Sequence, residues 1–144
     1  MKKIIIITVS LVLFTLVVSC SKSKSIQIKS AWMKPGIKGN TSAAYFIIDN
    51  PLDQQDRLLS LESKIAGSIE IHQTTINNGN MLMNPQKSVE IPAHSKVEFK
   101  PQGLHAMFID LHENLQVGDK VETDFNFEKT GTITITIEIK EPNF

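Results

Sequence analysis

The sequence has very little cysteine and no recognisable catalytic motif. Its 144 residues include one cysteine, Cys20, so no disulfide can form within the chain. A G-x-S-x-G elbow, a phosphate-binding glycine loop and an H-E-x-x-H helix are all missing. The acidic residues are scattered on the polar phase of strand-like segments, which is typical of a solvated face. We therefore predict that the protein is not an enzyme.

The charge balance gives no reason to expect a nucleic-acid partner. The chain has 15 basic and 15 acidic residues, and removal of Lys2 and Lys3 with an N-terminal leader leaves 13 against 15. Nucleic-acid binding needs lysine and arginine clustered on one face, and the sequence contains no such basic patch.

The front of the chain has the layout of a secretory signal peptide. Lys2 and Lys3 precede the apolar run IIIITVSLVLFTLVV, which stops at Ser19 and Cys20. The run is short and poorly flanked for a membrane span. Its ending, VVSC, resembles the lipobox of bacterial lipoproteins, which implies cleavage before Cys20 and lipidation of the thiol. The alternative is an ordinary signal peptide followed by an incidental cysteine.

The lipoprotein interpretation divides the chain into three parts. Residues 1–19 are the signal peptide, residues 20–25 are the lipidated cysteine and a flexible tether, and residues 26–144 are one domain. Each buried methylene of an acyl chain contributes ~0.8 kcal/mol to membrane binding, so several acyl chains on one cysteine anchor the protein to a membrane. We expect an extracytoplasmic, periplasm-facing protein in which Cys20 is no longer available as a thiolate metal ligand.

Helical hydrophobic stripes are scarce after residue 25, and alternation with a period of two dominates. About nine short strand-like segments are separated by turn signals, including Asn50-Pro51 and the NNGN of residues 77–80. This spacing predicts one all-β domain with the architecture of an antiparallel Greek-key β-sandwich or barrel.

Histidine and methionine are the residues that the strand pattern does not explain. After the leader, the chain contains His72, His94, His105, His112, Met33, Met81, Met83 and Met107. His72 precedes the predicted NNGN turn, and Met81 and Met83 follow it. A hairpin would therefore place His72 opposite or diagonal to the methionines, depending on the register. His105 and Met107 share one face of a further strand.

Imidazole and thioether together favour reduced copper. Thioether sulfur is soft and uncharged, so it suits Cu(I) and contributes little to the binding of zinc, magnesium or calcium. Two imidazoles and two thioethers supply four neutral donors. A lipidated Cys20 disfavours a blue-copper electron-transfer centre, which needs a thiolate. The alternative for each residue alone is structural, with methionines filling the core and histidines lying at the surface.

The spacing of four of these residues resembles a family motif. His72, Met83, His105 and Met107 form the pattern H-x10-M-x21-H-x-M. This pattern is similar to the motif of the periplasmic PCu(A)C-type copper chaperones. The similarity extends over residues 31–139 and includes the segments AAYFIIDNP, VEFKPQGLHAMFIDL and FEKTGTITI.

The resemblance implies a cupredoxin-like β-sandwich that binds one Cu(I) ion at an exposed end. It assigns the ring nitrogens of His72 and His105 and the sulfurs of Met83 and Met107 as ligands, with Met81 as an auxiliary ligand at most. It also implies that the protein captures copper outside the cytoplasm. The recipient would be a copper-accepting protein, either a cytochrome oxidase subunit or a thiol copper-transfer protein.

The sequence departs from many relatives of that family in two places. The segment HQTTI after the first histidine lacks their extra methionines, and the chain ends at EPNF without a tail rich in histidine and methionine. We therefore expect one copper site, with His94 and His112 at the surface. Two alternatives remain: a structural or protein-interaction lipoprotein with no metal role, and a copper redox protein.

Overall fold

The computed structural model describes residues 24–77 and 79–141, and within these ranges the chain is all-β. The predicted signal peptide and Cys20 lie outside the described residues. The strands are β1 (Gln27–Met33), β2 (Ser42–Asn50), β3 (Asp56–Glu62), β4 (Ala66–Asn77), β5 (Asn80–Gln86), β6 (Val89–Ile91), β7 (Ser95–Phe99), β8 (Leu104–Leu111), β9 (Lys120–Phe127) and β10 (Gly131–Ile139). No helix long and apolar enough to cross a membrane occurs in this part of the chain.

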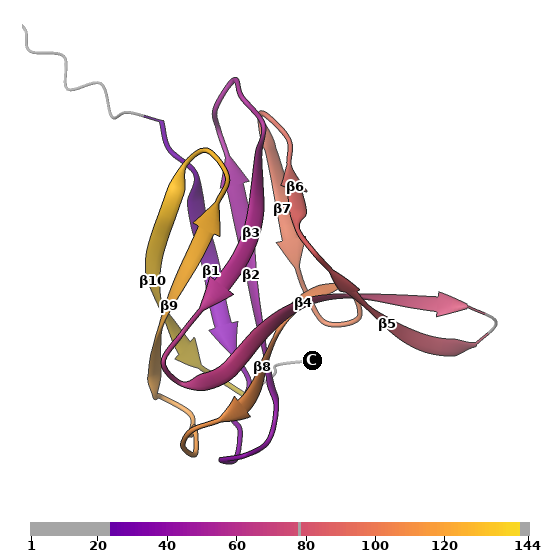
Figure 1. The fold of residues 1–144 in the computed structure, drawn as a ribbon, viewed down its shortest axis with the longest axis vertical. Coiled ribbons are helices and arrows are strands. Elements are labelled where there is room, and N and C mark those ends of the chain that lie inside the picture. Colours follow the sequence, from indigo (N-terminus) through magenta and orange to yellow (C-terminus); the bar gives the residue numbers. More distant parts are fainter. Residues whose placement is uncertain (1–23, 78, 142–144) are drawn as a thin grey trace, which may run out of the picture.

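The ten strands form one sheet in the order β5-β4-β8-β7-β2-β1-β10-β9-β3-β6 (Figure 1). Neighbouring strands are antiparallel except in the pairs β1–β10 and β7–β8, which are parallel. The predicted all-β class is confirmed, and the two parallel pairs are additions that alternation alone does not reveal. The sheet ends in β6, which has three residues, and in β5, which carries Pro85, a residue tolerated at sheet edges.

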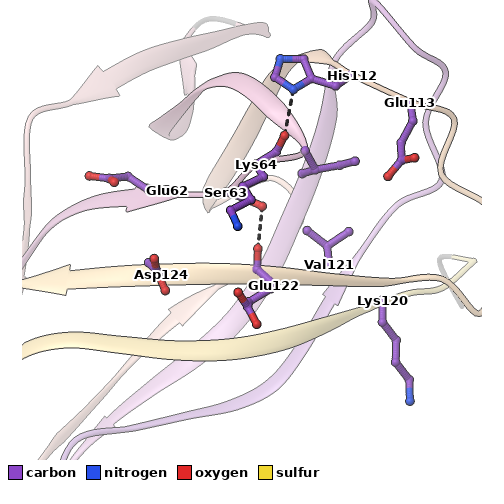
Figure 2. Close-up of a pocket in the computed structure, with 10 residues that line it drawn as sticks. Glu62, Ser63, Lys64, His112, Glu113, Lys120, Val121, Glu122 and Asp124 are labelled. Carbon is purple, nitrogen blue, oxygen red and sulfur yellow. Dashed lines mark hydrogen bonds between the residues drawn. The ribbon is translucent and has the colours of Figure 1, made fainter.

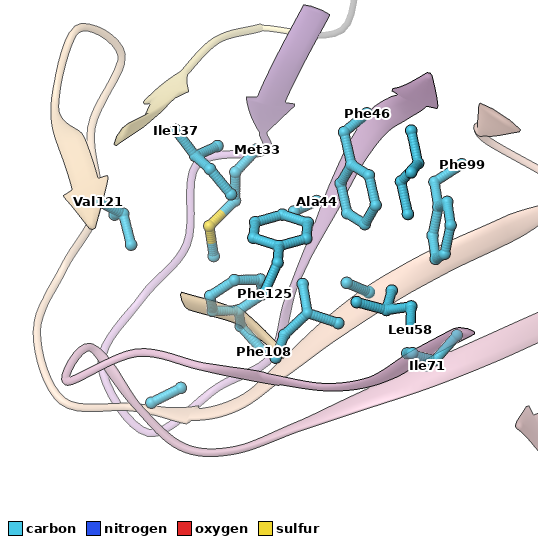
Figure 3. Close-up of a cluster of buried hydrophobic side chains, with 14 of the residues drawn as sticks. Met33, Ala44, Phe46, Leu58, Ile71, Phe99, Phe108, Val121, Phe125 and Ile137 are labelled. Carbon is cyan, nitrogen blue, oxygen red and sulfur yellow. The ribbon is translucent and has the colours of Figure 1, made fainter. Parts of the chain in front are cut away.

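The sheet is bent so that its two halves face each other. Phe46 on β2 and Phe125 on β9 are three strands apart in the sheet order, which corresponds to about 14 Å in a flat sheet. Their ring centroids are 4.8 Å apart in an edge-to-face arrangement, and Phe46 also stacks on Phe99 of β7 at 4.2 Å. One hydrophobic core therefore lies between the two layers (Figure 3). Met33 is fully buried in this core.

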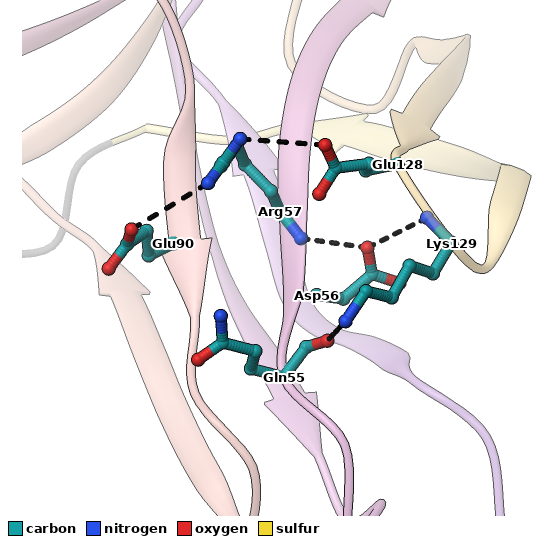
Figure 4. A network of polar contacts seen from close by, with 6 residues as sticks. All are labelled: Gln55, Asp56, Arg57, Glu90, Glu128 and Lys129. Carbon is teal, nitrogen blue, oxygen red and sulfur yellow. Dashed lines mark hydrogen bonds and ion pairs between the residues drawn. The ribbon is translucent and has the colours of Figure 1, made fainter.

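A buried carboxylate joins β3 to the turn between β9 and β10. Asp56 is 5% exposed, and it accepts hydrogen bonds from the backbone N–H of Arg57 at 2.7 Å and of Lys129 at 3.0 Å. Thr130 donates from its backbone N–H at 2.9 Å and from its hydroxyl at 2.6 Å. Figure 4 shows the Arg57 and Lys129 contacts, together with the surface ion pairs that Arg57 forms with Glu90 and Glu128.

Burial and hydrogen bonding act on this carboxyl in opposite directions. Burial raises the pKa of Asp56, but the hydrogen bonds from Thr130, Arg57 and Lys129 outweigh it and hold the pKa below its ordinary value of 3.8. A depressed folded-state pKa means that the ionised group stabilises the fold. That contribution is complete above the unfolded pKa and is lost as the pH falls through the lower folded value.

We predict that Asp56→Asn lowers the free energy of unfolding at pH 7 by about 1–3 kcal/mol, because the amide NH2 cannot accept the bonds that the carboxylate accepts. The difference in unfolding free energy between variant and wild type should narrow as the pH falls below about 4, because the unfolded wild-type chain then binds a proton that the native Asp56 carboxylate still resists. Urea unfolding followed by Trp32 fluorescence at pH 7 and pH 3 measures both values. The exposed neighbour Asp53 provides the control variant Asp53→Asn. If Asp56→Asn and wild type differed in unfolding free energy by the same amount at pH 7 and pH 3, the stabilising role of the ionised Asp56 would be contradicted.

Candidate metal centre

Strand pairing brings the predicted ligands onto one face of β5, β4 and β8. His72 on β4 lies directly opposite His105 on β8, and Met107 shares the face of His105 two residues later. On the other side of β4, Thr74 lies opposite Met83 of β5, so Met83 is diagonal to His72. Because paired residues project from the same face of a sheet, all four side chains project from one face. The expected diagonal arrangement of the hairpin is confirmed.

Three of the four predicted ligands line one cavity. Met83, His105 and Met107 surround an open cavity of ≈ 290 Å³, together with Tyr45 and residues of the β1–β2 segment. His72 does not line this cavity. Its ring lies beside that of His105, with centroids 5.9 Å apart and an interplanar angle of 67°.

The tautomer of His105 is set by the backbone. Its ring is 5% exposed, and Nδ1 lies 2.9 Å from the carbonyl oxygen of Gly103. A carbonyl oxygen only accepts hydrogen bonds, so Nδ1 donates and Nε2 of the neutral ring carries the lone pair. Metal-binding histidines are usually oriented in this way, by a hydrogen bond from the nitrogen that does not bind the metal.

His72 is held by a carboxylate instead. Its Nε2 lies 2.8 Å from Oε2 of Glu70, which is two residues earlier on the same face of β4. Its Nδ1 is buried and has no hydrogen-bond partner among the described residues. An unpaired buried nitrogen is uncommon in folded proteins, and it fits a position that binds a ligand.

The methionines differ sharply in burial. Met83 is 53% exposed on the edge strand β5, while Met107 is half-buried on β8. Met81 is equally exposed, lies opposite Ile76 further out on the hairpin and does not line the cavity. An exposed thioether contributes little to packing, so Met83 has no evident structural role.

The two histidines outside the motif lie at the surface, as predicted. His94 is exposed in the β6–β7 turn and pairs with Asp53 at 2.7 Å. His112 is exposed after β8, and its Nδ1 lies 2.8 Å from the carbonyl oxygen of Lys64. Neither histidine lines the cavity that contains His105.

Sequence reasoning missed Lys34 of the cavity wall and the contact between Glu70 and His72. The cavity wall includes Lys34, whose ammonium lies 5.7 Å from the ring centroid of Tyr45, and Tyr45 in turn packs against Trp32 at 4.7 Å. Only the pairing of distant strands brings these side chains to the cavity. The sequence contains a weak signal for the Glu70 contact. Glu70 and His72 are two residues apart, and side chains at that spacing on a strand project from the same face.

A larger cavity of ≈ 670 Å³ lies elsewhere, beside the β3–β4 connection and β9 (Figure 2). It is lined mainly by carboxylates and lysines. Figure 2 shows the two contacts that brace its wall: the Ser63 hydroxyl donates to the carbonyl of Glu122, and His112 contacts the carbonyl of Lys64. Among the described residues, no group of three or more His, Cys, Asp or Glu side chains is placed to hold a metal. The smaller, sulfur-lined cavity is therefore the candidate metal centre.

Residues 26–139 match the model of a family described as "Putative lipoprotein LpqE-like". Two relatives cover most of the domain. "Putative lipoprotein Lxx21020" of Leifsonia xyli subsp. xyli is 28% identical over 121 residues, which are 83% of this chain and 72% of the relative. "Uncharacterized protein RP573" of Rickettsia prowazekii is 27% identical over 124 residues, which are 83% of this chain and 68% of the relative.

Solved structures share the fold. The apo PCuAC domain of PmoF1 is 27% identical, with a TM-score of 0.69 over 81% of this chain and 94% of that domain. The copper-bound PCuAC domain of PmoF2 is 24% identical, with a TM-score of 0.70 over 83% of this chain and 97% of that domain. The CuI-DR1885 solution structure from Deinococcus radiodurans is 21% identical, with a TM-score of 0.61 over 84% of this chain and 83% of DR1885. The last two likenesses concern the fold alone, which is the predicted cupredoxin-like β fold.

Proposed function

Since the chain belongs to the LpqE-like lipoprotein family and carries two imidazoles and two thioethers on one sheet face, we propose that it is a metallochaperone for one Cu(I) ion. The observation that carries the proposal is the shared cavity of Met83, His105 and Met107, with His72 directly opposite His105. These four residues are the proposed ligands, and Met81 is at most an auxiliary one.

The donor chemistry supports copper in its reduced state. The four donors are neutral and two are soft, which is a poor set for zinc or calcium and a good one for Cu(I). Two fold neighbours support this choice: the PmoF2 domain is copper-bound, and DR1885 was solved with Cu(I). A neutral donor set leaves the positive charge on the ion, so the copper stays available to a partner that offers a thiolate.

The difference in burial among the ligands suggests how copper leaves. Met83 is exposed on an edge strand, so a ligand from a partner can replace its sulfur first. Met107 is half-buried, and His105 is buried and braced by the Gly103 carbonyl, so both leave later. The protein thus acts by ligand exchange, and no bond of a substrate is made or broken.

One observation favours a second candidate function. The β4–β5 hairpin projects from the body of the sheet (Figure 1), and Ile76, Met81 and Leu82 are exposed on it. Exposed apolar side chains in a group are typical of surfaces that bind proteins. A protein-interaction lipoprotein with no metal role would use this hairpin, whereas a chaperone would use it to approach its copper acceptor.

Copper binding is tested by anaerobic competition between the full-length protein, in detergent micelles, and a Cu(I) chelator. We expect one Cu(I) per chain, and more than about tenfold weaker binding in the Met83→Leu/Met107→Leu variant, since loss of a group that only supports a ligand already costs 10–100-fold. His94→Asn, outside the site, should bind as wild type does. Met83→Leu should unfold within about 0.5 kcal/mol of wild type, because that side chain is exposed. Wild-type binding no tighter than that of the double variant would refute the copper site.

We propose that Cys20 carries the lipid anchor, in agreement with the lipoprotein names of the family and of a relative. Cells grown with radiolabelled palmitate should incorporate label into the wild-type protein and not into Cys20→Ser. The double methionine variant is the matched control and should be labelled normally. A Cys20→Ser protein that still carries label would place the lipid on another residue.

We further propose that the copper is delivered, on the extracytoplasmic face of the membrane, for assembly of the copper centre of cytochrome oxidase. Cells in which the Met83→Leu/Met107→Leu protein replaces the wild type should lose oxidase activity when copper is scarce. They should regain it when copper is added, because uncatalysed loading then suffices. Full oxidase activity at limiting copper would point to a different recipient, while leaving copper binding itself intact.

A further inference from the structure

Glu70 and His72 form a pair that the ligand motif does not include. Both project from the site face of β4, since Glu70 lies opposite Met107 and His72 lies opposite His105. Oε2 of Glu70 is 2.8 Å from Nε2 of His72. An ionised carboxylate has no proton to donate, so Nε2 is the donor, and in the neutral ring the lone pair is on Nδ1.

The other ring nitrogen of His72 is in an unusual state. Nδ1 is buried and has no hydrogen-bond partner within residues 24–77 and 79–141. In a neutral imidazole the N–H of one nitrogen and the lone pair of the other point away from each other in the ring plane, so a ring held at Nε2 by Glu70 turns the Nδ1 lone pair away from Glu70. The remaining neighbours of His72 on this face are His105 on β8, Pro85 directly opposite on β5 and, toward the hairpin turn, Thr74 and Met83.

His105 has the reverse arrangement. Its Nδ1 donates to the Gly103 carbonyl, which leaves Nε2 with the lone pair. The two rings meet edge to face at 5.9 Å. Each ring is therefore fixed through one nitrogen by a group outside the cavity, and each keeps one lone pair for a ligand.

The geometry points to Glu70 as the positioning residue of the site: it holds His72 through Nε2–H, so that copper is received by Nδ1 of His72 and by Nε2 of His105. The part of this inference that concerns copper rests on the proposed function, and the part that concerns the apo protein does not. A carboxylate that accepts the second N–H of a metal-binding histidine fixes the ring and raises its basicity. Glu70 also brings a negative charge near an ion that its four neutral ligands leave uncompensated.

The apo protein provides the first test. Long-range proton–nitrogen correlation spectra of the full-length protein in detergent micelles, at about pH 8 where imidazoles are neutral, report which nitrogen of each ring carries the proton. We expect His72 to be protonated at Nε2, with slow exchange of that proton, and His105 to be protonated at Nδ1. A His72 ring protonated at Nδ1 would overturn the inference whether or not copper binds.

Copper loading provides the second test, because Cu(I) is diamagnetic and the same spectra can be recorded. We expect the nitrogen shift of His72 to change at Nδ1 while the Nε2 proton remains, and that of His105 to change at Nε2. Loss of the His72 Nε2 proton on loading would mean that copper displaces Glu70, which contradicts its positioning role. Failure of wild type to bind Cu(I) at all would refute the proposed function and leave the apo result standing.

Variants test the carboxylate itself. Glu70→Leu removes the acceptor at similar size, so the slow exchange of the His72 N–H should be lost and Cu(I) affinity should fall by about 10–100-fold. Glu70→Gln retains an acceptor oxygen, so it should keep part of the slow N–H exchange of His72 and part of the Cu(I) affinity. Glu122→Leu, an exposed glutamate on β9, is the matched control. Wild-type affinity in a folded Glu70→Leu protein would overturn the inference, and if that variant does not fold, the Glu70→Gln and wild-type spectra decide.

Discussion

The pairing of β4 with β8 is the constraint on which the candidate metal centre depends. Ile71 lies opposite Ala106, and both are buried in the core on one face of the pair. The next residues along, His72 and His105, therefore face each other on the opposite side. A shift of one residue would turn the imidazoles into the core and expose the apolar pair. Hydrophobic burial on one face thus fixes the position of the polar donors on the other.

Alternation in the sequence predicted the faces correctly but not the neighbours. It placed His105 with Met107, and the same period of two puts Glu70 and Thr74 on the face of His72. It could not show that β4 lies between β5 and β8, since pairing of strands far apart in the chain leaves no local signal. For the same reason Lys34 was not predicted as part of the cavity wall. Alternation likewise could not show that His72 contacts Glu70 and lies beside the cavity without lining it.

The site combines a rigid side with an accessible one. His105 lies on a strand that pairs with β4, β7 and β2, and a backbone carbonyl braces its ring. Met83 lies on β5, which pairs with β4 alone. Strands paired on both sides open less readily than edge strands, so the two halves of the donor set belong to regions of different local stability. A carrier needs both properties, because it must retain its cargo in solution and give it up to a recipient.

Pro85 on β5 affects how the chains behave when they are crowded. An edge strand exposes unpaired backbone groups that can template the addition of a strand from another molecule. Pro85 lies opposite His72 and has no N–H to offer, so the outer edge of β5 is interrupted beside the donor face. A proline in this edge strand therefore disfavours the addition of a foreign strand next to the candidate metal centre.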